Sequence, residues 1–385
     1  MDRISEKPIM NQGRQVEMDV LKGSFIFLIF VVHSFQLLGN AEALQSAAYQ
    51  GIFSVGMFTG ASLFLFFMGF GLAYSRKQNA RDIAGSGIKW IGYQFLSNLC
   101  NMIVLLLPLG CYILIGRSIE EEVLIIKGLA PYVLLMLNIF YIAGVIQLLM
   151  AFFRRIRMPL YGYLIVALVV SATSPFLAQL SNSNRILEAI IRMFFTAGGT
   201  VSFAVWPYIS FTAIGYFFGR YFLTCGEKSL FYKRALPITI PISIAYITWI
   251  LLSNEQLPII FDYLHNQYMY PNVLKCIATT AILISLAGVI DPILNQGKKW
   301  GRGGQYIFGV IHFFSKHISK LYAVHIGVYF FVFGILQYNS QGTRACLLLS
   351  IPVSIGTILI VMAYVKYESH LKNLDKKKRK FYTKS

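Results

Sequence analysis

The stretch Met18-Asp19-Val20-Leu21-Lys22-Gly23-Ser24-Phe25-Ile26-Phe27-Leu28-Ile29-Phe30-Val31-Val32-His33-Ser34 decides how the chain is organised. It has the pattern of an apolar helix with a cation, Lys22, at its mouth and a histidine, His33, in its interior. At 1.5 Å per residue, their spacing separates the two side chains by roughly 16 Å along the helix axis. An ionisable group inside a membrane segment normally faces the bundle interior or a wet cavity. We therefore expect the rest of the chain to form a scaffold around this pair.

The composition of the whole chain is that of a polytopic membrane protein. Of its 385 residues, 56% are hydrophobic and only 13% are charged, and the mean hydropathy is +0.62. Soluble domains carry about twice that share of charge. The net charge of +18 would suggest nucleic-acid binding in a soluble protein. Here the basic residues form short clusters between apolar runs, which is typical of cytoplasmic loops, so no nucleic-acid partner is expected.

Apolar runs of about 17 to 25 residues predict an all-α bundle of about ten transmembrane helices. The Trp206-Pro207 pair in the sixth run predicts a kink or break, because proline lacks the backbone donor. We predict one membrane domain over 24–366, preceded by a cytoplasmic segment, 1–23, and followed by a basic cytoplasmic tail, 367–385. The ten expected helices are 24–39, 56–75, 90–115, 130–153, 159–180, 201–222, 235–253, 272–294, 319–337 and 345–365.

The distribution of Lys and Arg predicts that both termini are cytoplasmic. With the N-terminus inside, 28 of the 34 basic residues fall in cytoplasmic segments, and such a bias sets orientation. The basic cluster at 376–380 is expected to anchor the topology and to attract anionic membrane lipids. The Lys and Ile content and the short polar loops favour a bacterial plasma membrane.

Neither a metal site nor a disulfide framework is expected. The five cysteines show no C-x-x-C spacing and are expected to be buried free thiols. The sequence also lacks an H-E-x-x-H run and a nucleotide-binding glycine loop, because the glycines at 301–304 neither follow a strand nor open a convincing helix.

Histidine and basic residues near the first helix are the candidates for chemistry. His33 is suited to act as a general base towards a hydroxyl or amine. The phosphates of a cytoplasmic donor could be bound by charge-assisted hydrogen bonds. The candidates for that role are Lys22, Arg76, Lys77, Arg81 and Lys89. Two plainer interpretations stay open. His33 could be a neutral, hydrogen-bonded histidine between helices, and each loop cation could serve only the membrane orientation.

Several motifs resemble those of the membrane acyltransferase superfamily, which contains the acyltransferase 3 enzymes and the heparan-α-glucosaminide N-acetyltransferase-like proteins. Asp19-Val20-Leu21-Lys22-Gly23 with His33 resembles the family's Asp-hydrophobic-hydrophobic-Arg-Gly opening and its Arg-x10-His motif, with lysine in place of arginine. Lysine keeps the charge but lacks the planar fork. Further similar segments follow in the family's order at 60–70, 88–98, 205–219, 268–272 and 319–325.

The resemblance implies transfer of an acyl group, usually acetyl, from cytoplasmic acyl-coenzyme A to a glycan or amino-sugar acceptor. It implies that His33 is the catalytic histidine, that Lys22 lies near the donor, and that His325 is a second site histidine. Asp19, one turn before Lys22, completes the expected catalytic set. An acyl-histidine intermediate and direct transfer both stay open.

Two other classes of function are compatible with a polytopic chain. A transporter or flippase for a glycan or a lipid-linked precursor would use the histidine for gating or proton coupling. The lack of an internal repeat and the scarcity of acidic residues within the expected helices argue against it. A membrane scaffold in a cell-envelope synthesis complex would need neither coenzyme A nor His33.

Overall fold

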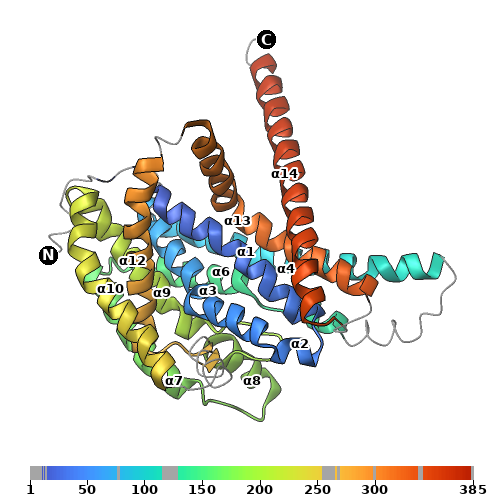
Figure 1. Cartoon of the computed structure of the whole chain (residues 1–385), viewed down its shortest axis with the longest axis horizontal. Helices are drawn as coiled ribbons and strands as arrows, with labels where there is room; N and C mark the ends of the chain where they lie inside the picture. The colour runs from blue at the N-terminus through green and yellow to red at the C-terminus, as the bar shows by residue number, and fades with distance from the viewer. Residues whose placement is uncertain are drawn as a thin grey trace.

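The computed structural model describes residues 11, 13, 15–75, 79–114, 129–253, 265–266, 269–297, 301–336 and 341–382. These residues form a helical bundle without a β-sheet (Figure 1), which confirms the all-α prediction. The named elements are α1 (Val16–Leu38), α2 (Ala41–Gln45), α3 (Ala47–Tyr74), α4 (Ala80–Leu114), α6 (Ile139–Arg155), α7 (Leu160–Leu177), α8 (Arg185–Ile191), the π-helical turn η1 (Arg192–Thr196), α9 (Val205–Thr224), α10 (Lys228–Ser253), α12 (Val273–Gly297), α13 (Gly301–Leu336) and α14 (Thr343–Tyr382).

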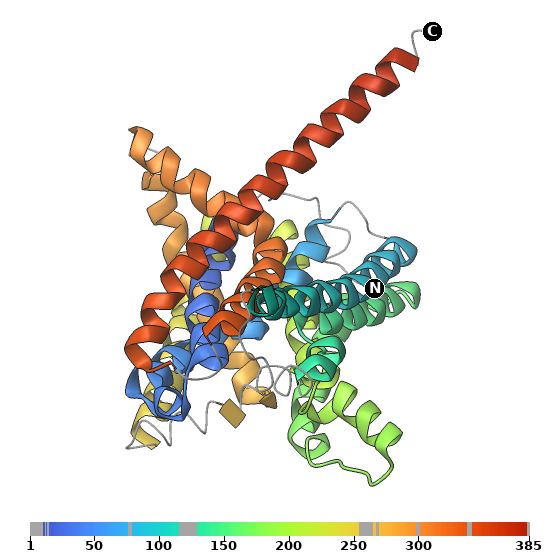
Figure 2. The ribbon, with the colours of Figure 1, turned by 90° about the vertical axis from the view of Figure 1, so that its right-hand side faces the viewer.

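The helix α1 lies between two packed regions of the bundle. On one side it contacts α3 and α12, and on the other it contacts α13 and α14. Its side chains Ile26, Phe30 and Phe35 are completely buried. The far end of α14 leaves the bundle and projects away from it (Figure 2). The stretch around Lys22 and His33 therefore forms a central element of the fold, as its sequence predicts.

Glycines bring α3 and α9 into backbone contact. A Cβ at Gly69 would lie 2.0 Å from the carbonyl oxygen of Thr212, and one at Gly215 would lie 2.0 Å from that of Phe66. Thr212 Oγ1 donates a hydrogen bond of 3.1 Å to the Leu65 carbonyl across the same interface. Small residues at helix crossings are how membrane helices approach closely, since lipid offers no hydrophobic driving force between them.

Eight described helices are long and apolar enough to span a membrane: α1, α3, α4, α7, α10, α12, α13 and α14. The other two expected spans, 130–153 and 201–222, correspond to α6 and α9. α6 has only 17 residues. α9 is buried along most of its length and is not among the eight. A helix enclosed by other helices needs no apolar outer face. The chain is thus an integral membrane protein, while the count of ten and the cytoplasmic placement of both termini stay predictions.

Two expected spans are not continuous helices over their predicted ranges. The run 130–153 is broken at 136–138, and the run 201–222 becomes helical only at Val205, so that Pro207 lies in the first turn, where it causes no kink. The two breaks are joined by hydrogen bonds from Leu137 N to Thr200 O, 2.7 Å, and from Ser202 N to Leu137 O, 2.8 Å. Irregular backbone is tolerated at membrane depth where protein groups satisfy it.

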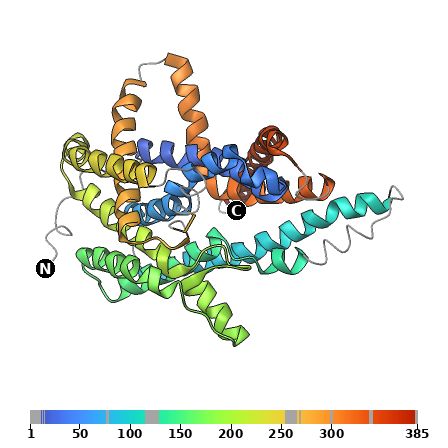
Figure 3. The same ribbon diagram turned by 60° about the horizontal axis from the view of Figure 1, so that its bottom comes forward.

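The sequence predicts an inner loop between the expected helices 272–294 and 319–337, but residues 301–318 of that stretch are helical. α13 begins at Gly301, and only His317, with φ −111° and ψ 18°, departs from helical geometry within it. Figure 3 shows the adjoining ends of α12 and α13 extending together beyond α1. The glycines at 301–304 have a low helix propensity, and for that reason the sequence favours a loop there. In the structure they form the first turn of the long helix α13.

An ion cluster joins α1, α10 and α12 near the start of α1. Lys228 Nζ lies 2.6 Å from Glu17 Oε2 and 2.7 Å from Asp291 Oδ1. Tyr232 donates a hydrogen bond of 3.1 Å to Glu17 Oε1. The Glu17 side chain is only 1% exposed. The predicted N-terminal segment 1–23 therefore includes a residue that is part of the packed bundle.

We expect Lys228→Met to lower the free energy of unfolding by about 3 kcal/mol, because it leaves Glu17 buried without its cation. The lower melting temperature in detergent measures the loss. Adding Glu17→Gln should recover part of it, since the uncompensated charge is then removed. An unchanged melting temperature in Lys228→Met would show that the cluster contributes nothing.

Candidate active site

The two predicted site histidines meet where α1 packs against α13. The ring centroids of His33 and His325 are 5.3 Å apart. His325 is completely buried, and the rings of Phe30 and Tyr322 lie 5.2 Å and 5.1 Å from it. The pair was predicted from motifs almost three hundred residues apart, and the fold brings them into contact.

Hydrogen bonding assigns different states to the two nitrogens of His325. Its Nδ1 lies 3.1 Å from the Leu321 carbonyl oxygen, which can only accept, so Nδ1 carries the proton. Nε2 is then a lone-pair acceptor, and it is buried without a hydrogen-bond partner among the described residues. A buried acceptor of this kind is costly, and such groups are found at functional sites as well as at sites of strain.

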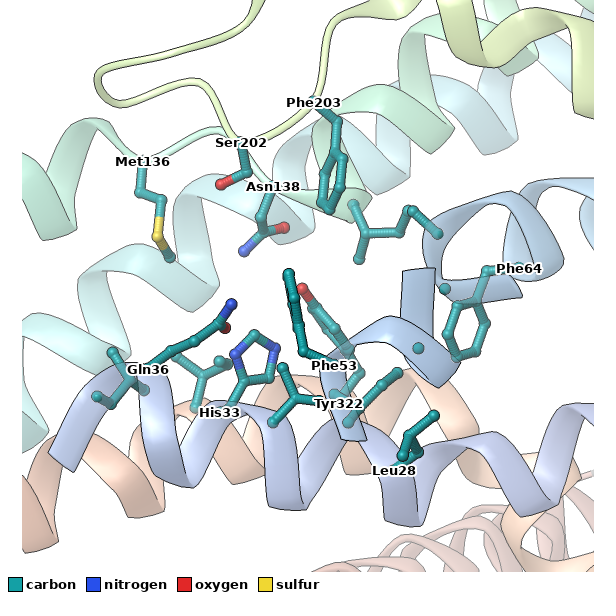
Figure 4. A pocket seen from close by; sticks show the side chains of 18 of the residues that line it. Leu28, His33, Gln36, Phe53, Phe64, Met136, Asn138, Ser202, Phe203 and Tyr322 are labelled. Carbon is teal, nitrogen blue, oxygen red and sulfur yellow. The ribbon is translucent and has the colours of Figure 1, made fainter. Parts of the chain in front are cut away.

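A cavity of about 580 Å³, here called the His33 cavity, opens beside this pair. Gln36, one turn after His33, hydrogen-bonds the His33 side chain, and its Nε2 donates to the Tyr49 hydroxyl at 3.4 Å. Figure 4 shows His33 and Gln36 of α1 facing Asn138 across the cavity. Its polar lining residues are His33, Gln36, Tyr132, Asn138, Ser202, His265 and Tyr322.

The broken segments described above form the wall opposite α1. Asn138 caps α6 by accepting a hydrogen bond of 3.1 Å from Phe140 N. Gln94 and Asn98 of α4 both donate to the Met136 carbonyl, at 3.0 Å and 2.7 Å. These buried amides hold the break open, so that Asn138 reaches the cavity instead of continuing a helix.

A second cavity, of about 300 Å³ and here called the Lys22 cavity, lies towards the start of α1. Asp19 Oδ1 accepts a hydrogen bond of 2.5 Å from Ser315 Oγ at its edge. The polar residues that line it are Lys22, Gln147, Ser315, Lys316, Ser319 and Tyr322. Two lysines and three hydroxyl-bearing residues therefore line this cavity, and such side chains suit phosphate oxygens.

The two cavities are neighbours, because Phe64, Ile139 and Tyr322 line both. Lys22 and His33 belong to one cavity each and lie roughly 16 Å apart along α1. A long, thin ligand could therefore reach from Lys22 to His33 past the Tyr322 ring.

The structure separates the remaining predicted site residues from the histidine pair. Asp19 precedes His33 by fourteen residues, about 21 Å along the helix, and lies at the Lys22 end. Arg81 and Lys89 are exposed on α4 and line neither cavity. Arg76 and Lys77 lie outside the described residues. A role for these four cations in donor binding stays a prediction.

Most lining residues were not assigned a role from the sequence, and the mechanism proposed below uses four of these: Gln36, Asn138, Lys316 and Tyr322. Gln36 could have been found, because it follows His33 by three residues on the same helix face. Tyr322 stands in the segment 319–325, Ser-x-x-Tyr-x-x-His in this chain, whose resemblance to the family pointed to His325. Asn138 could not have been found, because its position depends on the break in the predicted helix at 136–138. Lys316 could not have been found either, because it lies on a part of α13 that was not predicted to be helical. Among the residues that the structure describes, no three His, Cys, Asp or Glu side chains group to hold a metal ion.

One known family model matches the part of the chain that contains Lys22, His33 and Asn138. The family model described as heparan-alpha-glucosaminide N-acetyltransferase, catalytic, matches residues 14–259, which is more than half of the chain. The match includes Lys22 and His33, whereas His325 lies beyond it. No curated protein and no solved structure matches the sequence.

Proposed function

The chain belongs to the heparan-alpha-glucosaminide N-acetyltransferase catalytic family, and from this premise we propose that it transfers an acyl group, in the simplest case acetyl, from acyl-coenzyme A to a glycan or amino-sugar acceptor. The observation that carries the proposal is the pair of adjoining cavities, one containing Lys22 and the other containing His33. The positive-inside bias supports placing the Lys22 cavity on the cytoplasmic side of a bacterial plasma membrane.

The donor would bind with its phosphates at Lys22 and Lys316 and with its pantetheine arm past Tyr322. The cations provide charge-assisted hydrogen bonds to the phosphates. The residues that line both cavities, Phe64, Ile139 and Tyr322, are largely apolar and would suit the arm better than the nucleotide. This pose would bring the thioester to His33, which lies roughly 16 Å from Lys22 along α1.

His33 would act as the general base for the transfer. It would take the proton of the acceptor hydroxyl or amine as that group attacks the thioester carbonyl carbon. The carbon–sulfur bond then breaks, and the proton passes from His33 to the departing coenzyme A thiolate. Gln36 orients the His33 ring, and Asn138 across the cavity would donate to the acceptor or to the developing oxyanion.

We expect Lys22→Gln to raise the KM for acetyl-coenzyme A about tenfold and to leave kcat nearly unchanged, because one charged hydrogen bond to a phosphate is lost. Initial rates at varied donor concentration measure this effect. The matched control is Lys233→Gln, which removes the same charge from an exposed position on α10, outside both cavities. Equal KM values in Lys22→Gln and the unchanged protein would exclude Lys22 from donor binding.

Thermal stabilisation by coenzyme A separates this proposal from transport. A ligand that binds the folded state raises the melting temperature by mass action. We expect coenzyme A to raise the melting temperature of the wild type, and to do so less in Lys22→Gln at the same concentration. A melting temperature that does not change with millimolar coenzyme A would show that the protein is not a coenzyme A-dependent transferase.

A further inference from the structure

The His33 cavity has an apolar side that the transfer of acetyl alone leaves unused. Successive residues of an α-helix are turned by about 100°, so Lys22, Ile29 and His33 lie within about 20° of one line along α1. Leu28 and Val32 are turned by about 80–120° from that line. Both line the same cavity. The cavity therefore extends sideways from the direct line between Lys22 and His33.

Small residues of α3 line this lateral extension together with the α1 side chains. They are Gly56, Gly60 and Ala61. A Cβ at Gly56 would lie 3.6 Å from Leu28 Cδ2 and 3.9 Å from Val32 Cγ2, which are ordinary contact distances. Gly60, with φ 27° and ψ −130°, interrupts the regular helix, and that positive φ favours glycine. We call Leu28, Val32, Gly56, Gly60 and Ala61 the apolar branch.

The apolar branch and the polar wall of the cavity, which comprises Gln36, Asn138 and Ser202, lie on different sides of His33. Figure 4 shows Leu28 and Phe64 on one side of His33 and Gln36 and Met136 on the other. Gln36, Asn138 and Ser202 provide hydrogen-bonding groups on the polar side. The residues of the apolar branch have no polar side-chain atom, so a hydroxyl-rich acceptor placed there would lose its hydrogen bonds to water.

Three parts of the substrates must meet at His33, and each fits one region. The pantetheine arm fits the line from Lys22, and the acceptor fits the polar wall. The acyl chain is the one part that is pure hydrocarbon. We propose that the apolar branch holds the acyl chain of the donor, so that the site accepts unbranched acyl groups longer than acetyl. This inference rests on the proposed function. The bonds broken and formed are unchanged, and only the transferred chain is longer.

The test is a series of donors, acetyl-, butyryl-, hexanoyl- and octanoyl-coenzyme A, assayed by release of free coenzyme A in the presence of an acceptor. Each buried methylene should raise kcat/KM about threefold to fourfold until the apolar branch is full. Values of kcat/KM that stay constant or fall from acetyl to butyryl would overturn the inference.

Gly56→Leu should reverse this preference by filling the apolar branch. We expect the hexanoyl-to-acetyl ratio of kcat/KM to fall at least tenfold. Gly56→Ala, whose methyl group makes only ordinary contacts, should fold normally and give a smaller change. The matched control is Gly71→Leu on the same helix, where a Cβ meets nothing within 4 Å. It gains the same helix propensity and should leave the ratio unchanged.

The outcomes separate this inference from the proposed function. If Gly56→Leu raises the KM for the acceptor and leaves the donor ratio unchanged, the apolar branch holds part of the acceptor and the inference is wrong. If transfer occurs with no chain-length preference, the inference alone fails. If neither coenzyme A binding nor transfer is seen with any donor in the wild type, the proposed function itself fails.

Discussion

Replacement of His33 by alanine is expected to lower acyl transfer by about two to four orders of magnitude, the usual contribution of a positioned general base. The His33 side chain lines the larger cavity, contacts the His325 ring and is hydrogen-bonded by Gln36. No other described residue of the cavity combines a titratable nitrogen with contact to His325. The measurement is acceptor-dependent release of coenzyme A from acetyl-coenzyme A by the detergent-purified protein.

Two controls make the His33→Ala result specific to catalysis. The melting temperature and its rise with coenzyme A should match those of the wild type, since His33 lies about 16 Å from Lys22 along the helix axis. Gln36→Leu should cost less than His33→Ala, because it disturbs the orientation of the base without removing it. If His33→Ala kept more than a tenth of the wild-type rate, His33 would be a structural histidine.

Substitution of Gly215 by valine is expected to prevent stable folding of the bundle. A Cβ there would lie 2.0 Å from the Phe66 carbonyl oxygen, and the obstacle is backbone, which cannot turn aside. The helices α3 and α9 would have to separate along the contact that also contains Gly69 and Gly219. Overpacking of a core costs about 1–3 kcal/mol and more where the backbone must move. We expect a large loss of the monodisperse protein peak in detergent and a strongly lowered melting temperature.

Gly71→Val is the matched control for this prediction, because it lies on α3 near the same interface but meets nothing within 4 Å. It places the same β-branched residue in a helix and should behave like the wild type. A Gly215→Val protein that purified and melted like the control would show that α3 and α9 are not in backbone contact.

The sequence was informative where hydrophobicity and charge alone decide the structure. Apolar runs predicted most of the helices that surround the site, although not the first part of α13, which carries Ser315 and Lys316. The cost of placing His33 in an apolar helix pointed to the cavity beside it. The family motifs predicted His325, although nothing in the sequence alone shows that α13 packs against α1. That contact depends on tertiary packing around Phe30 and Leu321, both completely buried between the two helices.

The breaks at 136–138 and before Val205 could not be predicted, because the competing groups are far away in the chain. Gln94 and Asn98 of α4 satisfy the carbonyl of Met136 and so replace helical hydrogen bonds at that point. The sequence around 130–153 is apolar apart from Asn138 and Gln147, and it favours one continuous helix. Asn138 enters the candidate site only because this distant pair of amides stabilises the break.

The most direct test of the central claim is an experimentally determined structure of the full chain with coenzyme A bound. The account predicts the phosphates beside Lys22, the pantetheine arm passing Tyr322 and the sulfur in the His33 cavity, within reach of the imidazole. Coenzyme A bound elsewhere on the protein, or with its sulfur away from His33, would contradict the assignment of the two cavities and with it the proposed mechanism.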